Sequence, residues 1–519
     1  MATIEKEPNA NVNSKAYAEA AIPPGFLPLA LRDFSIVSKI TCEKGCTYHY
    51  LKKGSEKKLL VAANREGSLP GGFVGDKLVR AGKHFLVCEQ TPANAAALRS
   101  SLPLTKPTTV GNCNSFGFGD RLGNAGAAHL RSLGDSGFMP ILAQQSIREL
   151  DRTRRTASEV MDAATWAVLQ QGYTGGYGAD ADHLKTFADI DRMMQAGFTM
   201  YTIDPSDHVD NRVVEMDEKA LQKAFWELPW EKLSDNPDAF LKRYEDVTFA
   251  LNYDITLHVS RQAALQAAVK YGRVILHTLE MSRYLKNTYA ECESEMELSV
   301  DETPHPTTPE EHLIIASELK RLDVALVSLA PRFCGDFEKG IDFKGDIEEF
   351  KREYLLHQGI AAVYGGYKLS IHSGSDKFQI YDAIGKLGVG TVHVKTAGTS
   401  YLEALRAVAQ TDPELLREIF AFSLERFETD RKTYHISAEV KKLADPDSYS
   451  DDELPGLLDN DDARQVFHVT FGSVLTESIP RSGITFRNRI MEVLRENEDV
   501  YEDCLYRHFR KHIQPFENQ

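Results

Sequence analysis

Four segments between Thr199 and Ser400 join a short apolar run to charged or polar residues. They read FTMYTIDPSDHVDN (198–211), EMELSVDETPHPTTPEEH (295–312), YKLSIHSGSDKF (367–378) and TVHVKTAGTSY (391–401). Each segment places acids, histidines or a lysine where a β-strand is expected to stop. A mixture of carboxylate and imidazole groups is typical of a divalent metal site that also performs general acid–base chemistry.

Two histidines are the first candidates for metal ligands. His372 lies in Ile-His-Ser-Gly and His393 in Val-His-Val-Lys. Neighbouring strands lie about 4.8 Å apart, so both imidazoles could reach one ion. Asp204, in IDPSDH, is the candidate third ligand. The alternative for each histidine is a hydrogen-bonded residue of the core, and the sequence leaves it open.

Two carboxylates are the candidate proton carriers. Asp120 lies in GFGDRLG and Glu302 follows Ser-Val-Asp. A carboxylate at a strand end in a dry pocket can exchange protons near neutral pH. Asp120 could instead be a turn aspartate or the ion-pair partner of an arginine. Glu302 could instead be an acid near the start of a helix at Thr308, where the helix dipole favours it.

Cations and amides at other strand ends predict a polar ligand. Arg332 lies in SLAPRFCGD, Lys377 in SGSDKF and Lys395 in HVKTAG, while Gln145 ends the run LAQQS. Such residues bind carboxylate, phosphate or hydroxyl groups. We therefore expect a sugar or sugar acid rather than an apolar ligand.

Alternating strand and helix signals position these residues. Further strands are expected in 108–123, 138–146 and 322–331, and amphipathic helices in 181–197 and 254–288. A capping box at Thr308 starts another helix. Strand–helix alternation implies parallel pairing with right-handed crossovers, and seven or eight strands can close a barrel. The sequence predicts a TIM-type (β/α)8-like barrel, in which the strand ends form one rim.

Three regions follow from this pattern. Residues 1–107 are expected to form an N-terminal arm and a small α+β module. Residues 108–410 are the barrel, interrupted by a helical insertion at 212–294. Residues 411–519 are expected to form a helical extension packed on the barrel, in which the acidic run 445–462 is a solvated connector.

The composition limits the partners. The chain has 519 residues, of which 42% are hydrophobic and 26% charged, and its net charge is −16. This charge argues against nucleic acid as a partner. No apolar run is long enough to span a bilayer, and the N-terminus lacks the apolar core of a secretory signal. Seven scattered cysteines do not suggest a disulfide framework, so we expect a cytoplasmic protein. The sequence does not indicate an oligomeric state.

Six segments together resemble one family, the bacterial tagaturonate/fructuronate epimerases. They lie between about 115 and 406 and read GFGDRLG, LAQQSIREL, SVDETPHPTTPEEH, SLAPRFCGDFEKGIDFKGDIEEF, LSIHSGSDKF and HVKTAGTSYLEALR. The resemblance implies a metal-dependent TIM-barrel-like isomerase that interconverts D-tagaturonate and D-fructuronate by inversion at C4 in hexuronate catabolism. Relatives also epimerise tagatose and fructose. The site residues named above come from the expected strand ends and not from the resemblance.

The implied chemistry is compatible with those residues. Inversion at C4 of a 2-keto sugar acid can proceed by retro-aldol opening of the C3–C4 bond or by direct proton exchange at C4. Both routes need a Lewis acid, for which Zn, Mn, Co or Ni would serve, and acid–base groups. Two other interpretations remain open. One is a class II-type sugar aldolase or ketose isomerase, and the other is a non-catalytic accessory subunit of an aldolase complex.

Overall fold

The computed structural model describes residues 26–42, 45–252, 255–374, 376–479 and 483–517. Within them, eight parallel strands close into a barrel in which each strand pairs with the next along the chain and the last pairs with the first. The arm expected at the N-terminus lies outside the described residues. The barrel strands are β6 (Ser115–Gly119), β7 (Met139–Ser146), β8 (Gly178–Leu184), β9 (Met200–Ile203), β12 (Glu295–Ser299), β13 (Ser328–Ala330), β14 (Lys368–Gly374) and β15 (Val392–Thr396).

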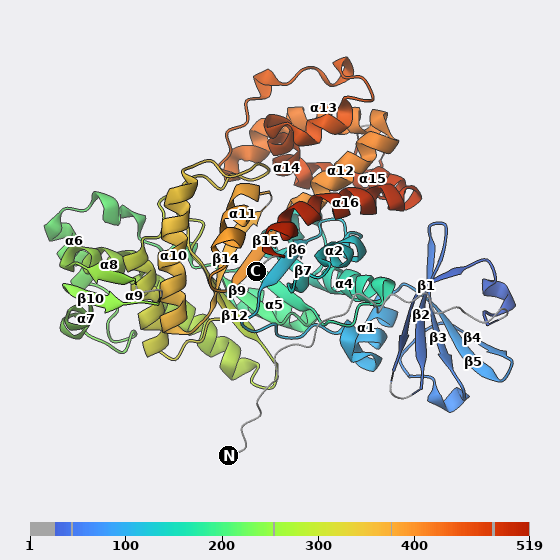
Figure 1. Ribbon diagram of the computed structural model, residues 1–519, viewed down its shortest axis with the longest axis horizontal. Helices are drawn as coiled ribbons and strands as arrows, with labels where there is room; N and C mark the ends of the chain where they lie inside the picture. The colour runs from blue at the N-terminus through green and yellow to red at the C-terminus, as the bar shows by residue number, and fades with distance from the viewer. Residues whose placement is uncertain (1–25, 43–44, 253–254, 375, 480–482, 518–519) are drawn as a thin grey trace.

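A helix follows every barrel strand, which confirms the (β/α)8 prediction (Figure 1). Thr156, Thr186 and Thr308 begin three of these helices with capping boxes, each closed by an acid three residues later. The helices around the barrel are α2 (Gly126–Leu133), α3 (Ile147–Thr153), α4 (Ala157–Gln171), α5 (Phe187–Ala196), α8 (Arg261–Thr288), α9 (Pro309–Arg321), α10 (Ile347–Tyr364), α11 (Phe378–Leu387) and α12 (Thr399–Thr411).

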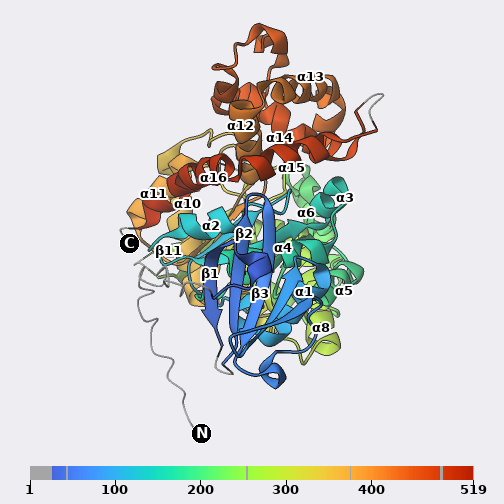
Figure 2. The same cartoon turned by 90° about the vertical axis from the view of Figure 1, so that its right-hand side faces the viewer.

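An antiparallel sheet precedes the barrel and stands to one side of it (Figures 1 and 2). Its strands pair in the order β1-β2-β3-β5-β4 and are followed by one helix, α1 (Pro92–Ser101). The strands are β1 (Ser35–Thr41), β2 (Thr47–Lys53), β3 (Glu56–Ala63), β4 (Asp76–Arg80) and β5 (Lys83–Glu89). This is the α+β content that the sequence predicts for the first 107 residues.

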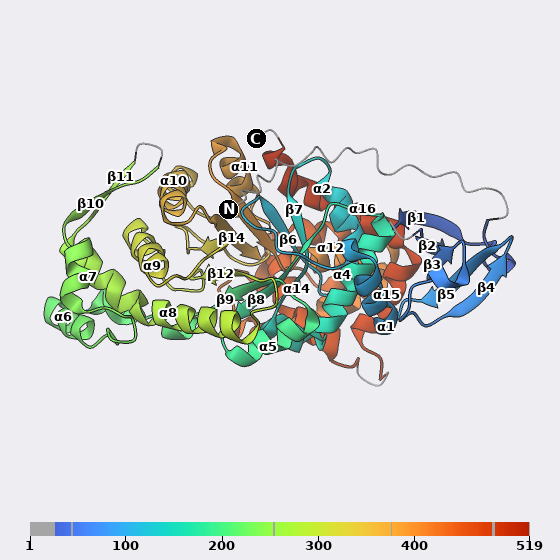
Figure 3. The ribbon, with the colours of Figure 1, turned by 90° about the horizontal axis from the view of Figure 1, so that it is seen from below.

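The insertion lies at the opposite end of the molecule from this sheet (Figure 3). It consists of α6 (Glu218–Trp226), α7 (Pro237–Tyr244) and a hairpin of β10 (Val247–Ala250) with β11 (Thr256–Val259). The long helix expected from residue 254 therefore starts only at Arg261, because the N-cap Ser260 follows the second hairpin strand. Residue 254 itself lies outside the described residues.

Four helices after the barrel pack above its rim (Figure 1). They are α13 (Pro413–Asp430), α14 (Asp461–Thr476), α15 (Phe486–Glu496) and α16 (Glu498–Ile513). Helix α16 lies along α2 and α12, and its Phe509 ring stands 6.2 Å from that of Phe116 on β6. The C-terminal helices thus share the hydrophobic core of the barrel.

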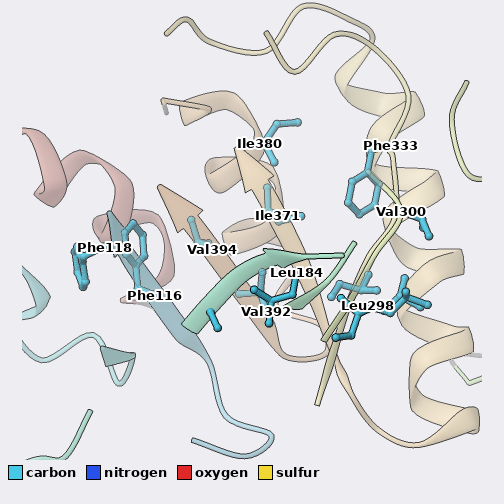
Figure 4. Close-up of a cluster of buried hydrophobic side chains, with 14 of the residues drawn as sticks. Phe116, Phe118, Leu184, Leu298, Val300, Phe333, Ile371, Ile380, Val392 and Val394 are labelled. Carbon is cyan, nitrogen blue, oxygen red and sulfur yellow. The ribbon is translucent and has the colours of Figure 1, made fainter. Parts of the chain in front are cut away.

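The barrel strands turn apolar side chains outward and polar ones inward. On β15, Val392 and Val394 join the hydrophobic layer beneath the helices (Figure 4), whereas His393 and Lys395 face the lumen. Strand β8 follows the same rule, with Ala179 and Ala181 outside. The sequence prediction of a helix from 181 is wrong for its first residues, because 181–184 continue β8 and α5 begins only at Phe187.

Candidate functional site

A lysine surrounded by carboxylates occupies the centre of the barrel. The Nζ atom of Lys395 lies 2.8 Å from Asp180 Oδ2, 2.8 Å from Asp182 Oδ1 and 2.8 Å from Glu297 Oε1. These groups come from β15, β8 and β12, and all are buried. A buried charge is tolerated when it is paired and hydrogen-bonded. The network therefore fixes the positions of carboxylates from two strands just below the rim.

A bulge in β8 brings His183 to the rim. In a regular strand, His183 would face outward because its neighbour Asp182 faces inward. The pairing of β8 with β9 shifts between Ala181 and Leu184, and His183 has a positive φ of 51°. Bulges and unusual backbone angles are frequent at active sites, where they re-aim a side chain. Here the His183 ring stands 5.3 Å from that of His372 on β14.

His183 links two groups of possible metal ligands. Asp182, His183 and His372 form one group, and His183, Asp204 and Glu302 form the other. Within each group the candidate ligand atoms lie within 4.8 Å of one another. His183 Nδ1 is buried 3.4 Å from Asp204 Oδ2 without hydrogen-bond geometry. Imidazole nitrogens and carboxylate oxygens together suit a first-row divalent cation.

The electrostatics of these groups favour positive charge. Burial opposes protonation of His183, but the carboxylates of Asp182 and Asp204 raise its pKa to about 10. Burial likewise opposes protonation of His372, but Asp301 and Glu297 help raise its pKa to about 9. The raised pKa of both rings reflects the negative charge of the carboxylates around them. A divalent cation would supply the same compensation.

A cavity of about 520 Å³ opens above this cluster. Its size suits a small polar ligand. Helix α3, the loops after β12 and β13 and the end of β14 supply its walls. Thr433, Tyr434 and His435 reach it from the segment between α13 and α14. The C-terminal extension thus encloses the pocket. Three basic side chains line the cavity: Arg148, Arg332 and Lys339.

Four of the residues predicted from sequence meet at this pocket. His372, Glu302 and Arg332 line it, and Asp204 lies beneath it in contact with His183. Glu302 pairs with Arg148 at 2.9 Å, and a guanidinium nitrogen of Arg332 donates to the Thr303 carbonyl oxygen. Lys395 is close below, but carboxylates surround it and bind it in place of a ligand.

Asp120 has a structural role instead of the predicted catalytic one. Its carboxylate accepts backbone N–H groups from Leu122, Gly123 and Ala125, at 3.2, 2.7 and 2.8 Å. These bonds close the turn after β6, so the turn-aspartate alternative is the one that the geometry supports.

Gln145 also departs from its predicted role. It faces outward and donates to Glu149 at 3.3 Å, while its neighbour Gln144 faces the lumen and lines the cleft beside Lys395. The strand register explains this, since successive side chains point to opposite faces.

Lys377 and His393 do not reach the pocket. Lys377 is buried and donates to the carbonyl oxygens of Glu338, Ile341 and Asp376 at 2.9, 2.5 and 2.9 Å. His393 pairs in register with Ser370, two residues below the level of His372, and its Nδ1 contacts Ser115 Oγ at 2.9 Å. Among the described residues, His393 belongs to no group of potential ligands. The geometry therefore corrects the expectation that His372 and His393 share an ion.

The sequence reasoning missed several residues of the site, namely Asp182, His183, Asp301, Lys339 and Arg148. A signal for Asp182 was present, because the alternation Ala-Asp-Ala-Asp in 179–182 has the period of a strand with a charged inner face. Lys339 lies in the long loop between β13 and α10 and has no periodic signal.

Comparison with known proteins shows the family of this chain and proteins of similar fold. Residues 37–516 match the family model described as UxaE: tagaturonate epimerase. The tagaturonate/fructuronate epimerase of Thermotoga maritima is 41% identical over 484 residues, which are 93% of this chain and 97% of that protein. Two crystal structures of fructuronate-tagaturonate epimerase UxaE from Cohnella laeviribosi, native and with one glycerol, are each 37% identical. Each superposes with a TM-score of 0.86 and covers 94% of this chain and 97% of its own.

No helix within the described residues has the length and apolar character needed to cross a membrane.

Proposed function

Since this chain belongs to the tagaturonate epimerase family, we propose that it interconverts D-tagaturonate and D-fructuronate by inverting C4. The observation that carries the proposal is the family match over nearly the whole chain, joined to a cation-lined pocket at the carboxyl ends of the barrel strands. This end is where barrel enzymes carry their catalytic residues. Neutral ketoses such as tagatose would be weaker substrates of the same pocket.

The residues that would hold a divalent metal are Asp182, His183 and His372, with Asp204 orienting the His183 ring. Their nitrogen and oxygen donors fit Zn, Mn, Co or Ni equally well, so the donor set does not select among them. A metal bound there would supply Lewis acidity at the keto and hydroxyl oxygens of the substrate. The buried network of Lys395 would hold Asp182 in place from below.

Two adjacent carboxylates are the proposed proton carriers. Asp301 faces His372 at 3.3 Å, and Glu302 faces Arg148 at 2.9 Å on another wall. The two side chains would therefore contact different parts of a bound sugar. Glu302 would take the proton from the C4 hydroxyl oxygen in a retro-aldol route, and would return it after the aldehyde has rotated. Tyr434 and its neighbours would exclude water above the substrate.

The activity test uses full-length protein loaded with Mn²⁺ or Zn²⁺ and incubated with D-tagaturonate. Fructuronate should form, and EDTA should stop its formation. Accumulation of three-carbon fragments alone would indicate an aldolase, and formation of an aldose an isomerase; either result contradicts the proposal. In D₂O, retention of hydrogen at C4 would favour the retro-aldol route, whereas deuterium at C4 would indicate direct proton exchange.

Arg332 is the proposed partner of the substrate carboxylate. Its guanidinium carries five N–H donors, and the contact with Thr303 engages one nitrogen. A charge-assisted hydrogen bond contributes roughly 1.5–3 kcal/mol. The variant Arg332→Met should therefore raise KM for tagaturonate about 10–100-fold, with a much smaller change for D-tagatose, which has no carboxylate. Steady-state kinetics with both substrates measures the change in KM for each of them.

Lys339→Met serves as the matched variant, because this second cation lines the same cavity. The assignment would be contradicted if Lys339→Met lost the preference for tagaturonate over tagatose while Arg332→Met kept it. Lys339 would then be the residue that binds the substrate carboxylate.

A further inference from the structure

A second histidine–carboxylate cluster lies outside the pocket, where the last helix meets the loop after β14. His508 and His512 occupy consecutive turns of α16, and Asp376 lies just before α11. Helix α16 packs against α11, one of the helices around the barrel (Figures 1 and 2). All three side chains are buried, and their ligand atoms lie within 4.8 Å of one another.

Both imidazoles direct the same nitrogen at one oxygen. His508 Nε2 lies 2.8 Å and His512 Nε2 3.2 Å from Asp376 Oδ1. The other carboxylate oxygen, Oδ2, is occupied by Arg464 Nη2 at 2.5 Å. Thr399 Oγ1 also donates to Oδ1, at 3.4 Å, so this oxygen has one remaining lone pair for the space between the two rings.

The opposite nitrogens fix the tautomers. His508 Nδ1 lies 3.0 Å from Glu403 Oε1, and His512 Nδ1 lies 3.2 Å from the His508 carbonyl oxygen. Both neighbours are acceptors, so each Nδ1 carries a hydrogen and each neutral ring turns a lone pair toward Asp376. A hydrogen bond from Nδ1 to a carboxylate or carbonyl is the usual support of a metal-binding histidine.

Asp376 Oδ1 and the Nε2 atoms of His508 and His512 are therefore all acceptors, and they lack the hydrogens that would pair them with one another. His512 Nε2 is fully buried and has no hydrogen-bond partner among the described residues. One proton on His508 would satisfy the shortest contact and leave His512 unsatisfied, whereas one divalent cation would satisfy all three. Tetrahedral coordination places such donors roughly 3.3 Å apart, close to the observed separations.

We propose that Asp376, His508 and His512 form a second, structural divalent metal site, of the type that binds Zn²⁺. It ties the C-terminal helix to Asp376, which lies four residues after His372. The site is independent of the catalytic pocket, since none of its three residues lines that cavity.

The test uses a full-length double variant, His183→Gln with His372→Gln, in which the pocket cluster is disabled. Titration with Co²⁺ should give one tight equivalent with the strong visible absorption of tetrahedral cobalt. Adding His512→Gln should remove this equivalent. If the double variant binds no cobalt, or if the triple variant still binds one equivalent, the proposal is overturned.

A stability measurement covers the case in which the triple variant misfolds. Zn²⁺ should raise the Tm of the double variant, and chelation should reverse the shift. The control His129→Gln, added to the same background, removes another buried histidine whose Nε2 contacts Ser400 Oγ at 2.8 Å. It should keep both the bound metal and the shift. A Tm that does not respond to Zn²⁺ in the double variant would indicate that a proton on His508 occupies the site. Neither the cobalt titration nor the Tm measurement depends on enzyme activity. A failure of the metal-site proposal can therefore be told apart from a failure of the epimerase proposal.

Discussion

Replacing His372 with glutamine is expected to lower kcat/KM for tagaturonate by at least about 10²-fold, the lower range for a lost catalytic group. The ring lies against Glu297 at 2.7 Å and near Asp301 at 3.3 Å, and its ligand atom belongs to the group with Asp182 and His183. The variant should also lose one bound metal equivalent. Metal analysis of the purified protein, beside steady-state kinetics, measures both effects.

His393→Gln is the matched control for this prediction. His393 lies on the neighbouring strand β15, is also buried, and contacts Ser115 without joining the cluster. It should retain the metal in the pocket. Loss of that metal in His393→Gln, with full occupancy in His372→Gln, would contradict the present assignment and return the site to the pair expected from sequence.

The barrel could be predicted because its outer faces have a conventional pattern. Strands β12, β14 and β15 place Leu298, Ile371 and Val394 in the hydrophobic layer under the helices, and these apolar residues make the strands recognisable. A capping box at Thr308 marks the helix that follows β12, whereas α11 and α12 begin without a side-chain cap. Strand β8 has small outer residues, Ala179 and Ala181, before Leu184, so its polarity suggested the start of a helix. The barrel interior is charged, and the hydrophobic pattern of the sequence does not predict a charged interior.

Only the site residues that follow a recognisable strand could be predicted from the sequence. His372, Glu302 and Arg332 follow recognisable strands, and all three line the pocket. His393 is also on a recognisable strand, but its depth depends on the register between β14 and β15, which the sequence does not specify. His183 enters through a bulge with a positive φ, and such a local backbone change has no periodic signature.

Charged side chains in the lumen link the strands that carry the candidate site. Lys395 contacts Asp180 and Asp182 on β8 and Glu297 on β12, and Glu297 in turn contacts His372 on β14. The network therefore connects the strands that carry the proposed ligands. Supporting interactions of this kind hold catalytic groups in position, and their loss is expected to affect both stability and activity.

Replacing Lys395 with methionine should destabilise the fold by about 3–5 kcal/mol, because it leaves buried carboxylates without their counter-charge. Methionine preserves most of the apolar volume of the lysine stem, so the loss reports mainly on charge. The unfolding midpoint in urea at pH 7, compared with that of the wild-type protein, measures the effect.

The pH dependence of the stability lost in Lys395→Met tests whether the missing positive charge causes that loss. Burial raises the pKa of Asp182 and Glu297, but Lys395 is the strongest influence that holds both below their ordinary range in the wild type. That contribution to stability is present above the unfolded-state pKa of about 4 and is lost as pH falls through the folded-state pKa. Without Lys395, burial should raise the pKa of both groups, so the folded variant gains protons on acidification. The stability difference should be largest near pH 7 and shrink toward about pH 4–5.

Lys368→Met provides the matched comparison, since it removes another buried lysine from the lumen. Lys368 Nζ donates to the Gly111 carbonyl oxygen at 2.8 Å and to Ser115 Oγ at 3.1 Å, which are neutral partners. Its replacement should cost only about 1–3 kcal/mol, the usual cost of leaving buried polar groups unsatisfied. Equal losses in the two variants, or a Lys395→Met deficit that does not change with pH, would show that the carboxylates are compensated by other groups. The lumen would then tolerate its charge without Lys395, and the position of Asp182 beneath the pocket would need another explanation.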